Sequence, residues 1–513
     1  MLAAIRSAAV LGIDAYHVTV ETDAAHGLPQ FTVVGLPAGA VRESRERVSA
    51  ALINSGFILP PRRLTVNLAP ADVRKEGTAF DVPIALGILL ATGQLPADCA
   101  AKLIVAGELG LDGSIRAVRG VLPMARIAAR AIDHPTFVLP PANAAEASLV
   151  GGLKIAAPPT LAALVASVRR GSFDRVVAVP AETRADDALD LADVAGQESA
   201  KRALEVAAAG GHNLLLVGPP GAGKTMLARR LPGILPGLTE DERLEATAIH
   251  SVAGTLSLGV LTSRPFRAPH HSVSSAGLVG GGSAPRPGEV SLAHHGVLFL
   301  DELLEFPRAV LDALRQPLEE GRVIIARANA SVAFPARFTL VGAMNPCPCG
   351  YSGDAAHPCV CASADVARYR ARLSGPLSDR IDMHVTVSAV PITQLVAQGG
   401  ERSAAVRVRV ESARAAQRTR YASMHGVDCN AHVPGRWLDA QGTTSRSARS
   451  LLVAAANRLG LSARGYHRVL KVARTIADLD GAAQVDEAQV AESLRYRPTP
   501  ARDAPLHSTA AAR

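Results

Sequence analysis

The clearest indication of the fold is the segment Asn213-Leu-Leu-Leu-Val-Gly-Pro-Pro-Gly-Ala-Gly-Lys-Thr225. It joins an apolar run to the octet GPPGAGKT (residues 218–225), and the helical pattern Met226-Leu-Ala-Arg-Arg230 follows. A strand, then G-x-x-x-x-G-K-[ST], then a helix is typical of the phosphate-binding loop of nucleoside triphosphatases. The sequence therefore predicts a site for ATP or GTP. The alternative is a glycine-rich turn that binds nothing.

The residue types of the octet suit a bound phosphate. Gly218, Gly221 and Gly223 are expected to adopt backbone angles closed to other residues, so that successive N–H groups turn toward the anion. The N-terminus of the following helix adds its positive end. Lys224 is predicted to reach the β- and γ-phosphates, and the Thr225 hydroxyl is predicted to bind Mg²⁺.

Two further strands are predicted to end at the same edge of the sheet. The run Gly296-Val-Leu-Phe-Leu300 leads directly into Asp301 and Glu302, and carboxylates are costly to bury without a partner. Asp301 is expected to hold Mg²⁺, largely through water, and Glu302 to orient and deprotonate the attacking water. The alternative is an acidic turn. The third strand, 338–344, ends at Asn345, whose amide is expected to bond the γ-phosphate or the water. The predicted nucleotide-binding residues are Gly218, Pro219, Pro220, Gly221, Ala222, Gly223, Lys224, Thr225 and Asp301.

Composition narrows the class of protein. A chain of 513 residues predicts about three domains, and 48% hydrophobic with 19% charged residues is typical of an ordered protein. No apolar run approaches the ~20 residues of a membrane helix, and the first residues do not form a signal peptide. A cytoplasmic location is expected. The net charge of +8 permits a polyanionic partner, whereas 3% aromatic residues disfavour base stacking.

Five segments differ in pattern along the chain. Residues 1–164 alternate predicted strands (17–21, 31–34, 63–67) with predicted helices (40–53, 82–92), which indicates a compact α/β domain. Residues 165–188 are expected to be a linker, and 189–395 the nucleotide module. Residues 396–498 are predicted to be helical, with Arg407, Arg414 and Arg418 spaced along one side. Residues 499–513 are rich in Pro and Ala and are expected to be disordered.

Four of the six cysteines lie close together. Cys347, Cys349, Cys359 and Cys361 form two C-x-C pairs separated by nine residues. Four thiolates across a short loop suit a closed tetrahedral Zn²⁺ site, with His357 as a substitute ligand. Unliganded buried cysteines are the alternative. Cys99 and Cys429 stand alone and are interpreted as small apolar residues.

The motifs GPPGAGKT, VLFLDELLEF, VGAMNPCPCG, SGPLSDRIDMHV and LSARGYHRVLKVARTIADL follow in this order. Together they resemble the AAA+ ATPases related to the magnesium-chelatase ATPase subunit, and the chain up to about Pro498 is similar to the ComM/YifB family. The resemblance implies an α/β fold, with a three-layer αβα AAA+ module and helical lid behind a Lon-protease-like domain.

The resemblance also implies an activity. It is that of a hexameric ATPase, with ATP and Mg²⁺ as cofactors, which drives branch migration of joint DNA molecules in natural transformation. Two alternatives stay open at this stage. One is a chelatase- or chaperone-like ATPase that remodels a protein partner, and the other is an ATP-dependent protease.

The family pattern assigns further residues. Arg380 resembles the arginine finger that one subunit inserts into its neighbour's ATP site, and a hexamer is expected for that reason. Arg464 resembles the sensor 2 arginine, with Arg468 as the alternative. Residues 266–295 resemble a pore-facing insertion, in which His270 and His271 are expected either to contact DNA or to satisfy loop carbonyls. Residues 321–334 predict a β-hairpin turning near Asn329, with Arg327 as a DNA phosphate contact.

Resemblance to Lon requires a test for its Ser-Lys dyad. Ala79 occupies the position of the nucleophilic serine, and Val-Leu-Pro-Met follows Gly120 where the lysine is expected. Thr78 has no evident general base beside it. The sequence therefore predicts a non-proteolytic scaffold. Arg62, Arg63, Arg74 and Lys75 form either a DNA-binding surface or a solvated basic face.

Overall fold

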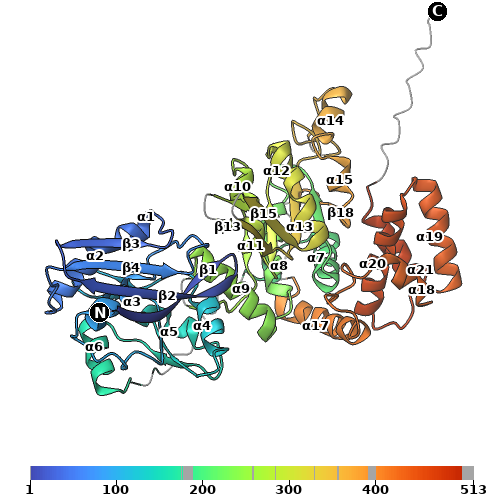
Figure 1. The fold of residues 1–513 in the computed structure, drawn as a ribbon. Helices are drawn as coiled ribbons and strands as arrows, with labels where there is room; N and C mark the ends of the chain where they lie inside the picture. The colour runs from blue at the N-terminus through green and yellow to red at the C-terminus, as the bar shows by residue number, and fades with distance from the viewer. Residues whose placement is uncertain are drawn as a thin grey trace, which may run out of the picture.

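A computed structural model describes residues 2–174, 176, 189–256, 259–282, 285–327, 330–354, 357–390 and 400–498. Three parts lie in a row (Figure 1): an α/β domain, a module with a parallel sheet, and a group of helices at the C-terminal side. The predicted tail, 499–513, and most of the predicted linker lie outside the described residues.

The N-terminal domain is built on a seven-stranded sheet of order β3-β4-β2-β1-β5-β8-β9. Its β1–β2 and β2–β4 pairs are antiparallel, and the other four pairs are parallel. Burial alternates along β4, with Leu64, Val66 and Leu68 inside, as a half-buried strand requires. The predicted strands are confirmed within β2, β3 and β4. The strands are β1 (Leu2–Leu11), β2 (Asp14–Ala25), β3 (Gln30–Val34), β4 (Arg63–Ala69), β5 (Leu103–Val105), β8 (Thr136–Val138) and β9 (Lys154–Ala156), with a β6 (Glu108–Leu109)–β7 (Ile115–Arg116) ribbon beside them.

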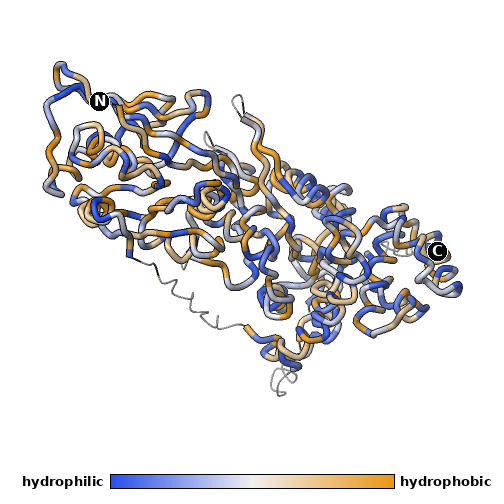
Figure 2. Tube along the Cα trace, turned by 60° about the horizontal axis from the view of Figure 1, so that its bottom comes forward, coloured by the Kyte–Doolittle hydropathy of each residue, from blue (hydrophilic) through white to orange (hydrophobic). Residues whose placement is uncertain are grey.

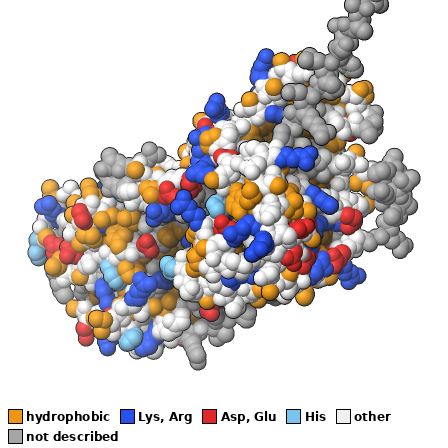
Figure 3. Space-filling model, turned by 90° about the vertical axis from the view of Figure 1, so that its right-hand side faces the viewer, with side chains coloured by type: hydrophobic (Ala, Val, Ile, Leu, Met, Phe, Trp, Pro, Cys, Tyr) orange, Lys and Arg blue, Asp and Glu red, His pale blue; other side chains and the backbone are white. Residues whose placement is uncertain are grey.

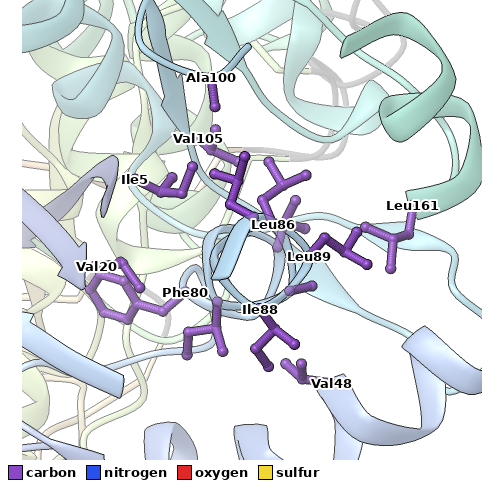
Figure 4. Close-up of a cluster of buried hydrophobic side chains, with 14 of the residues drawn as sticks. Ile5, Val20, Val48, Phe80, Leu86, Ile88, Leu89, Ala100, Val105 and Leu161 are labelled. Atoms are coloured by element: carbon purple, nitrogen blue, oxygen red, sulfur yellow. The ribbon is translucent and has the colours of Figure 1, made fainter. Parts of the chain in front are cut away.

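The core of this domain surrounds helix α3 (Asp81–Ala91). Every residue of α3 is buried, because its sequence is apolar on all sides and both the sheet and other helices cover it. Figure 4 shows α3 nearly end-on, with Ile5, Val20, Val48 and Leu161 converging on it from different elements. The other helices are α1 (Gly39–Arg42), α2 (Ser44–Asn54), α4 (Val121–Ala129), η1 (Pro141–Asn143), α5 (Ala144–Ala147) and α6 (Leu161–Arg170).

Helix α6 crosses the boundary expected between residues 164 and 165. Val165 and Val168 are 2% exposed and pack in the same core as Leu161. Gly171 then ends the helix with a φ of +69°, a conformation that glycine adopts without strain. The N-terminal domain therefore includes residues up to at least Arg170.

The nucleotide module contains a five-stranded sheet in which all strands are parallel. Its strand order is β11-β14-β17-β10-β18. Because β10 comes early in the chain yet pairs with both β17 and β18, the strand order reverses beside it, and ligands bind at such points in open α/β sheets. The strands are β10 (Leu214–Val217), β11 (Phe266–Arg267), β14 (Val297–Leu300), β17 (Thr339–Met344) and β18 (Met383–Thr386).

Helices cover both faces of this sheet. Leu214 and Leu216 belong to one core, with α7 (Glu198–Gly210) and α8 (Lys224–Ile234), whereas Leu215 belongs to the other, with α12 (Arg308–Ala313). Successive side chains of a strand point to opposite faces, so the apolar run before Gly218 contributes to both cores. The expected three-layer αβα arrangement is confirmed.

The connections of the module carry the predicted insertions. Two short helices flank a β12–β13 ribbon between β11 and β14, and the predicted hairpin is confirmed as antiparallel β15–β16, with Arg327 opposite Ala330. The side chain of Arg327 lies outside the described residues. The elements are η2 (Leu191–Asp193), α9 (Glu240–Ala253), α10 (Ser275–Val279), β12 (Gly280–Gly281), β13 (Arg286–Pro287), α11 (Glu289–Leu292), η3 (Leu303–Glu305), α13 (Arg315–Glu320), β15 (Arg322–Arg327), β16 (Ala330–Pro335), α14 (Ser363–Arg370) and α15 (Gly375–Ser378).

The C-terminal part is helical, as predicted. Helix α17 (Ser403–Arg420) packs against α7 and α8. Two of the three arginines spaced along it form hydrogen bonds across this contact. Arg407 donates to the carbonyl of Gly233, and Arg414 donates to that of Ala208. The remaining helices surround a core of their own. The helices are α17 (Ser403–Arg420), α18 (Gly435–Ala440), α19 (Arg446–Leu459), α20 (Ala463–Leu479) and α21 (Glu487–Arg495).

The N-terminal domain contacts the module through α4, α5 and α9. The Gly120 N–H donates to the Ser251 carbonyl at 3.1 Å, and the Ser251 hydroxyl donates to the buried Glu146 carboxylate. Burial raises the pKa of Glu146, and Ser251, Leu122 and Asn143 oppose that shift by donating hydrogen bonds to the carboxylate.

Hydrophobic and hydrophilic stretches are interspersed along the coloured part of the trace (Figure 2). Among the described helices, none combines the length and the apolar character that crossing a membrane requires.

Candidate functional site

The loop after β10 leaves a space in front of helix α8. Gly221 and Gly223 have φ angles of +76° and +88°, and a Cβ at either position would meet no atom within 4 Å. Gly218 is required for a different reason, because a Cβ there would lie 2.0 Å from the carbonyl oxygen of Val387. The expectation that all three glycines serve unusual backbone angles is therefore wrong for Gly218, which permits close packing beside β18.

Lys224 lies inside this loop. Its Nζ donates to the carbonyl oxygens of Gly218 and Pro219 at 2.6 and 2.9 Å, and to Oδ1 of Asn345 at 3.0 Å. Burial lowers the pKa of Lys224, while Asp301 and Glu302 oppose the shift. Asn345, which follows β17, therefore contacts Lys224, the first residue of α8.

Thr225 and Asp301 meet across the same space. The Thr225 hydroxyl donates to Oδ2 of Asp301 at 2.7 Å, although 76 residues separate them. Asp301 follows the last residue of β14, which is paired in parallel with β17. Hydroxyl and carboxylate oxygens are ligands that Mg²⁺ prefers, so these two oxygens are suited to hold such an ion.

Glu302 adopts a left-handed conformation with a φ of +50°. Its N–H donates to Oδ1 of Asp301 at 2.9 Å, and its side chain is 60% exposed. A non-glycine residue in this region is strained, and such strain clusters at functional sites. Nδ1 of His271 lies 3.6 Å from Oε2 of Glu302. Sequence reasoning assigned His271 to DNA or loop carbonyls and missed this neighbour, because 31 residues separate the two and no spacing signals the contact.

A cavity of about 620 Å³ opens in front of these groups. Its lining includes the predicted residues from Pro220 to Thr225, together with Asp301, Glu302 and Asn345. Glu305, Pro348 and Tyr369 also line it and were not predicted. The cavity therefore combines a cation, a helix N-terminus and carboxylates, which suits a phosphate group with a divalent metal ion.

Arg380 and Arg464 lie together at a second cavity of about 500 Å³, which shares no lining residue with the first. Arg380 donates to a carboxylate oxygen of Glu319, and the Arg464 guanidinium lies 3.8 Å from the other oxygen. Arg337 and Lys471 line the same cavity. The cluster of cationic side chains suits an anion and is separate from the chain's own phosphate loop.

Arg464 and Arg468 occupy different environments. The Arg464 side chain is 63% exposed, whereas that of Arg468 is 16% exposed. Arg468 donates to the Ile381 carbonyl at 3.3 Å and lies 3.5 Å from Asp382. Burial lowers the pKa of Arg468, and Asp382 opposes the shift. Arg468 is held against the residues that precede β18, whereas Arg464 is mostly exposed and has Glu319 as a neighbour.

The four clustered cysteines converge. The Sγ atom of Cys347 lies 3.3 Å from that of Cys349 and 3.6 Å from that of Cys359, and all four sulfurs lie within 4.8 Å of one another. Tetrahedral zinc with Zn–S bonds of about 2.3 Å needs sulfurs about 3.8 Å apart. Backbone N–H groups lower the pKa of Cys349 to about 6. A backbone N–H also acts to lower the pKa of Cys361, but the neighbouring thiols and burial outweigh it and raise that pKa to about 12. His357 instead packs its ring against Tyr351, with centroids 5.0 Å apart.

A second cluster, Glu245, His294 and His295, was missed by sequence reasoning. Nδ1 of His294 accepts from the Arg337 N–H at 3.0 Å, and Nε2 faces the Glu245 carboxylate at 3.2 Å. A neutral imidazole has one donor and one acceptor nitrogen, so His294 uses both and has no lone pair left for a metal ion. Burial lowers the pKa of His294 to about 4. The cluster therefore joins α9 to the start of β14 and is structural.

The N-terminal domain lacks the protease dyad at the expected positions. Ala79 is buried, and Val121 to Met124 form the first turn of α4. Thr78 does have a carboxylate beside it, contrary to the expectation, because its hydroxyl donates to Glu108 at 2.5 Å. Lys75 is buried, and its Nζ has no hydrogen-bond partner among the described residues. Lys75 is therefore no part of an exposed basic face.

Comparisons with known proteins match nearly the whole chain. Family profiles described as "Subunit ChlI of Mg-chelatase", "Magnesium chelatase, subunit ChlI" and "Magnesium chelatase, subunit ChlI C-terminal" match residues 20–143, 190–395 and 400–497. The competence protein ComM of Haemophilus influenzae is 46% identical over 505 residues, which cover 97% of each chain. The YifB protein of Escherichia coli is 42% identical over 506 residues, again 97% of each chain. Lon protease 2 of Bacillus subtilis is 29% identical over 185 residues, 30% of this chain and 32% of that protein.

Proposed function

The chain belongs to the ComM/YifB family of magnesium-chelatase-like AAA+ proteins, and from this membership we propose that it is a hexameric, ATP-hydrolysing DNA motor. Its work is branch migration of joint DNA molecules during natural transformation. One observation chiefly supports ATP hydrolysis: the proposed catalytic groups lie in two separate cavities. One cavity holds the phosphate loop, and the other holds Arg380 and Arg464.

The first cavity fits ATP. Among the described residues, the Nζ of Lys224 donates to neutral oxygens, so a triphosphate offers it a better partner than the loop carbonyls do. Open space at Gly221 and Gly223 leaves their N–H groups accessible to phosphate oxygens. Asn345, which already contacts Lys224, is suited to bond the γ-phosphate or the attacking water.

Thr225 and Asp301 are suited to hold Mg²⁺, which when bound neutralises charge on the phosphates. Glu302 is the general base of the proposal. Its carboxylate is exposed to the cavity and lies beside His271, so it can accept a proton from water and release it.

The second cavity suits a neighbouring subunit's nucleotide. Arg380 and Arg464 present guanidinium groups away from their own phosphate loop, and planar guanidinium groups stabilise charge on a transferring phosphoryl group. Until a neighbour docks, the Glu319 carboxylate lies beside both groups and offsets part of their charge. A composite site of this kind requires a ring, and a hexamer is the proposed assembly.

DNA is the proposed substrate of the ring. The net charge is +8, which favours contact with a polyanion. On the face in Figure 3, Lys and Arg side chains are interspersed with acidic and hydrophobic ones. The candidate contacts are Arg327 on the β15–β16 hairpin, and His270 and His271 of the insertion. We also propose that the four-cysteine cluster binds Zn²⁺. A cytoplasmic location is part of the same proposal, because cysteines stay reduced there.

The decisive experiment measures ATP hydrolysis with and without DNA. Forked and four-way substrates are expected to stimulate turnover more than duplex DNA does, and the stimulation is expected to fall as salt rises, because phosphate contacts release counterions. Lys224→Ala is the control, since it is expected to abolish hydrolysis on every substrate.

One result would contradict the DNA motor. If no nucleic acid changes either turnover or oligomeric state, while ATP is still hydrolysed, the substrate is not DNA. A remodelling ATPase that acts on a protein partner then becomes the better explanation.

A further inference from the structure

The four-cysteine cluster lies in a loop that packs directly against the phosphate-binding loop. This cysteine loop, taken here as the described residues 347–354 and 357–361, begins two residues after Asn345, and Asn345 accepts a hydrogen bond from Lys224. Pro348 lines the nucleotide cavity. The segment that carries the sulfurs is therefore continuous with the wall of the ATP site.

The packing is closest at Gly350. This residue has a φ of +90°, and a Cβ added to it would lie 2.6 Å from Cδ and 2.9 Å from Cγ of Pro220. Pro220 is the third residue of the phosphate-binding loop. The positive φ angle and the contact with Pro220 both exclude a side chain at this position. The cysteine loop therefore rests on Pro220 with no room to move closer.

The two halves of the cysteine loop meet through sulfur. Cys347 is fully buried and accepts from the Ser352 N–H at 3.2 Å, so the first half is anchored. Cys359 is exposed, and its Sγ lies 3.6 Å from those of Cys347 and Cys349. Thiols form weak hydrogen bonds, whereas four thiolates on one zinc ion form strong bonds. Zinc is therefore expected to be needed to hold the two halves of the cysteine loop together.

We propose that zinc bound by the cysteine loop controls the ATP site, because it holds Gly350 against Pro220 and Asn345 against Lys224. The proposal rests on the proposed ATPase function and adds a control to it. With zinc bound, the loop supports the wall that receives the phosphates. Without zinc, the second half of the loop separates, and both contacts with the phosphate site loosen.

The test compares three variants of the full chain. Cys359→Ser/Cys361→Ser removes two ligands on the exposed half, Gly350→Ala keeps all four thiols but disturbs the contact with Pro220, and Cys99→Ser in the N-terminal domain is the control. Zinc per chain is measured by elemental analysis after purification without chelator. Affinity for a fluorescent ATP analogue, kcat, KM and the thermal midpoint are measured on the same samples.

The wild-type protein and Cys99→Ser are expected to contain about one zinc ion per chain. The double cysteine variant is expected to lose zinc and to bind the analogue roughly tenfold more weakly, as residues that support a site typically cost when removed. Gly350→Ala is expected to retain zinc yet show a comparable loss of affinity. Removal of zinc from the wild-type protein with a chelator should produce the same loss, and zinc should reverse it.

Three results would overturn the proposal. They are wild-type protein without zinc, a zinc-free double variant with wild-type affinity and turnover, and a Gly350→Ala variant that binds the analogue normally. If the double variant does not fold, the chelator series on wild-type protein decides in its place. Failure of wild-type, zinc-loaded protein to bind or hydrolyse ATP would instead contradict the proposed function.

Discussion

At the scale of single residues, the phosphate site is assembled from side chains that reach across the sheet edge. Lys224 contacts Asn345, and Thr225 contacts Asp301, at 3.0 and 2.7 Å. These pairs could be anticipated, because parallel strands end at one edge and the sequence shows a polar residue directly after each. The role of Gly218 and the contact between His271 and Glu302 could not, because they depend on which loops are neighbours.

Glu302→Gln tests the general base. The amide cannot accept a proton, so turnover is expected to fall roughly 10²- to 10⁴-fold while the affinity for ATP is retained. Steady-state hydrolysis and binding of a fluorescent ATP analogue provide the measurement. Glu305→Gln is the matched control, since Glu305 lines the same cavity but lies 3.3 Å from Arg372 and has no proposed part in proton transfer. Unchanged turnover in Glu302→Gln would assign the base to another group.

At the scale of elements, the strands and helices with strong local patterns were predictable. The strands beside the phosphate loop have continuous apolar runs, and α3 is apolar on all sides. The end of the N-terminal domain was misjudged, because the polar residues of α6 resemble linker residues while Val165 and Val168 are buried. Whether one face of a short helix is buried depends on the domain that it packs against. Sequence composition does not show that packing.

Strand β18 carries a histidine whose protonation should affect stability. Burial, reinforced by Arg497 and Arg468, lowers the pKa of His384 to about 4, and Asp382 opposes the shift. The unfolded chain, with a pKa of about 6.5, then binds more protons between these values. Stability is therefore present near pH 7 and is lost as pH falls from about 6.5 to about 4, by roughly 3 kcal/mol in all.

His384→Gln is expected to reduce this dependence. Urea unfolding midpoints of the wild type and the variant, measured at pH 7 and pH 5, give the comparison. The wild-type midpoint should fall more than that of the variant over this interval. Equal falls would mean that His384 titrates alike in the folded and unfolded chains, and that other buried groups, such as His294, account for the pH dependence.

At the scale of the whole molecule, the phosphate loop and the arginine cluster lie in separate cavities of one chain. The proposed mechanism therefore pairs the phosphate loop of one chain with the arginine cluster of a neighbour. The N-terminal domain contacts this module through hydrogen bonds that join Gly120 and Glu146 to Ser251 of α9.

Arg380→Ala tests the shared site. Turnover is expected to fall by about 10³-fold or more, while ATP binding is retained, because an arginine finger acts on the transition state. Mixing this variant with Lys224→Ala should restore part of the turnover, since sites form that have Lys224 from one chain and Arg380 from its neighbour. A mixture of Lys224→Ala/Arg380→Ala with Arg380→Ala is the control and should stay inactive. Full activity of Arg380→Ala alone would mean that the finger lies elsewhere.

Local motifs were enough to predict the phosphate loop, the carboxylates after β14, the cysteine cluster and the family. Each of these features lies in a short contiguous run, and the backbone geometry of such a run depends mainly on its own residues. Three contacts became visible in the folded chain alone: Gly218 packs beside Val387, Gly350 packs against Pro220, and Glu319 faces both Arg380 and Arg464. Those contacts join residues far apart in the chain, and the order of strands in the sheet and the packing of helices on its faces bring them together.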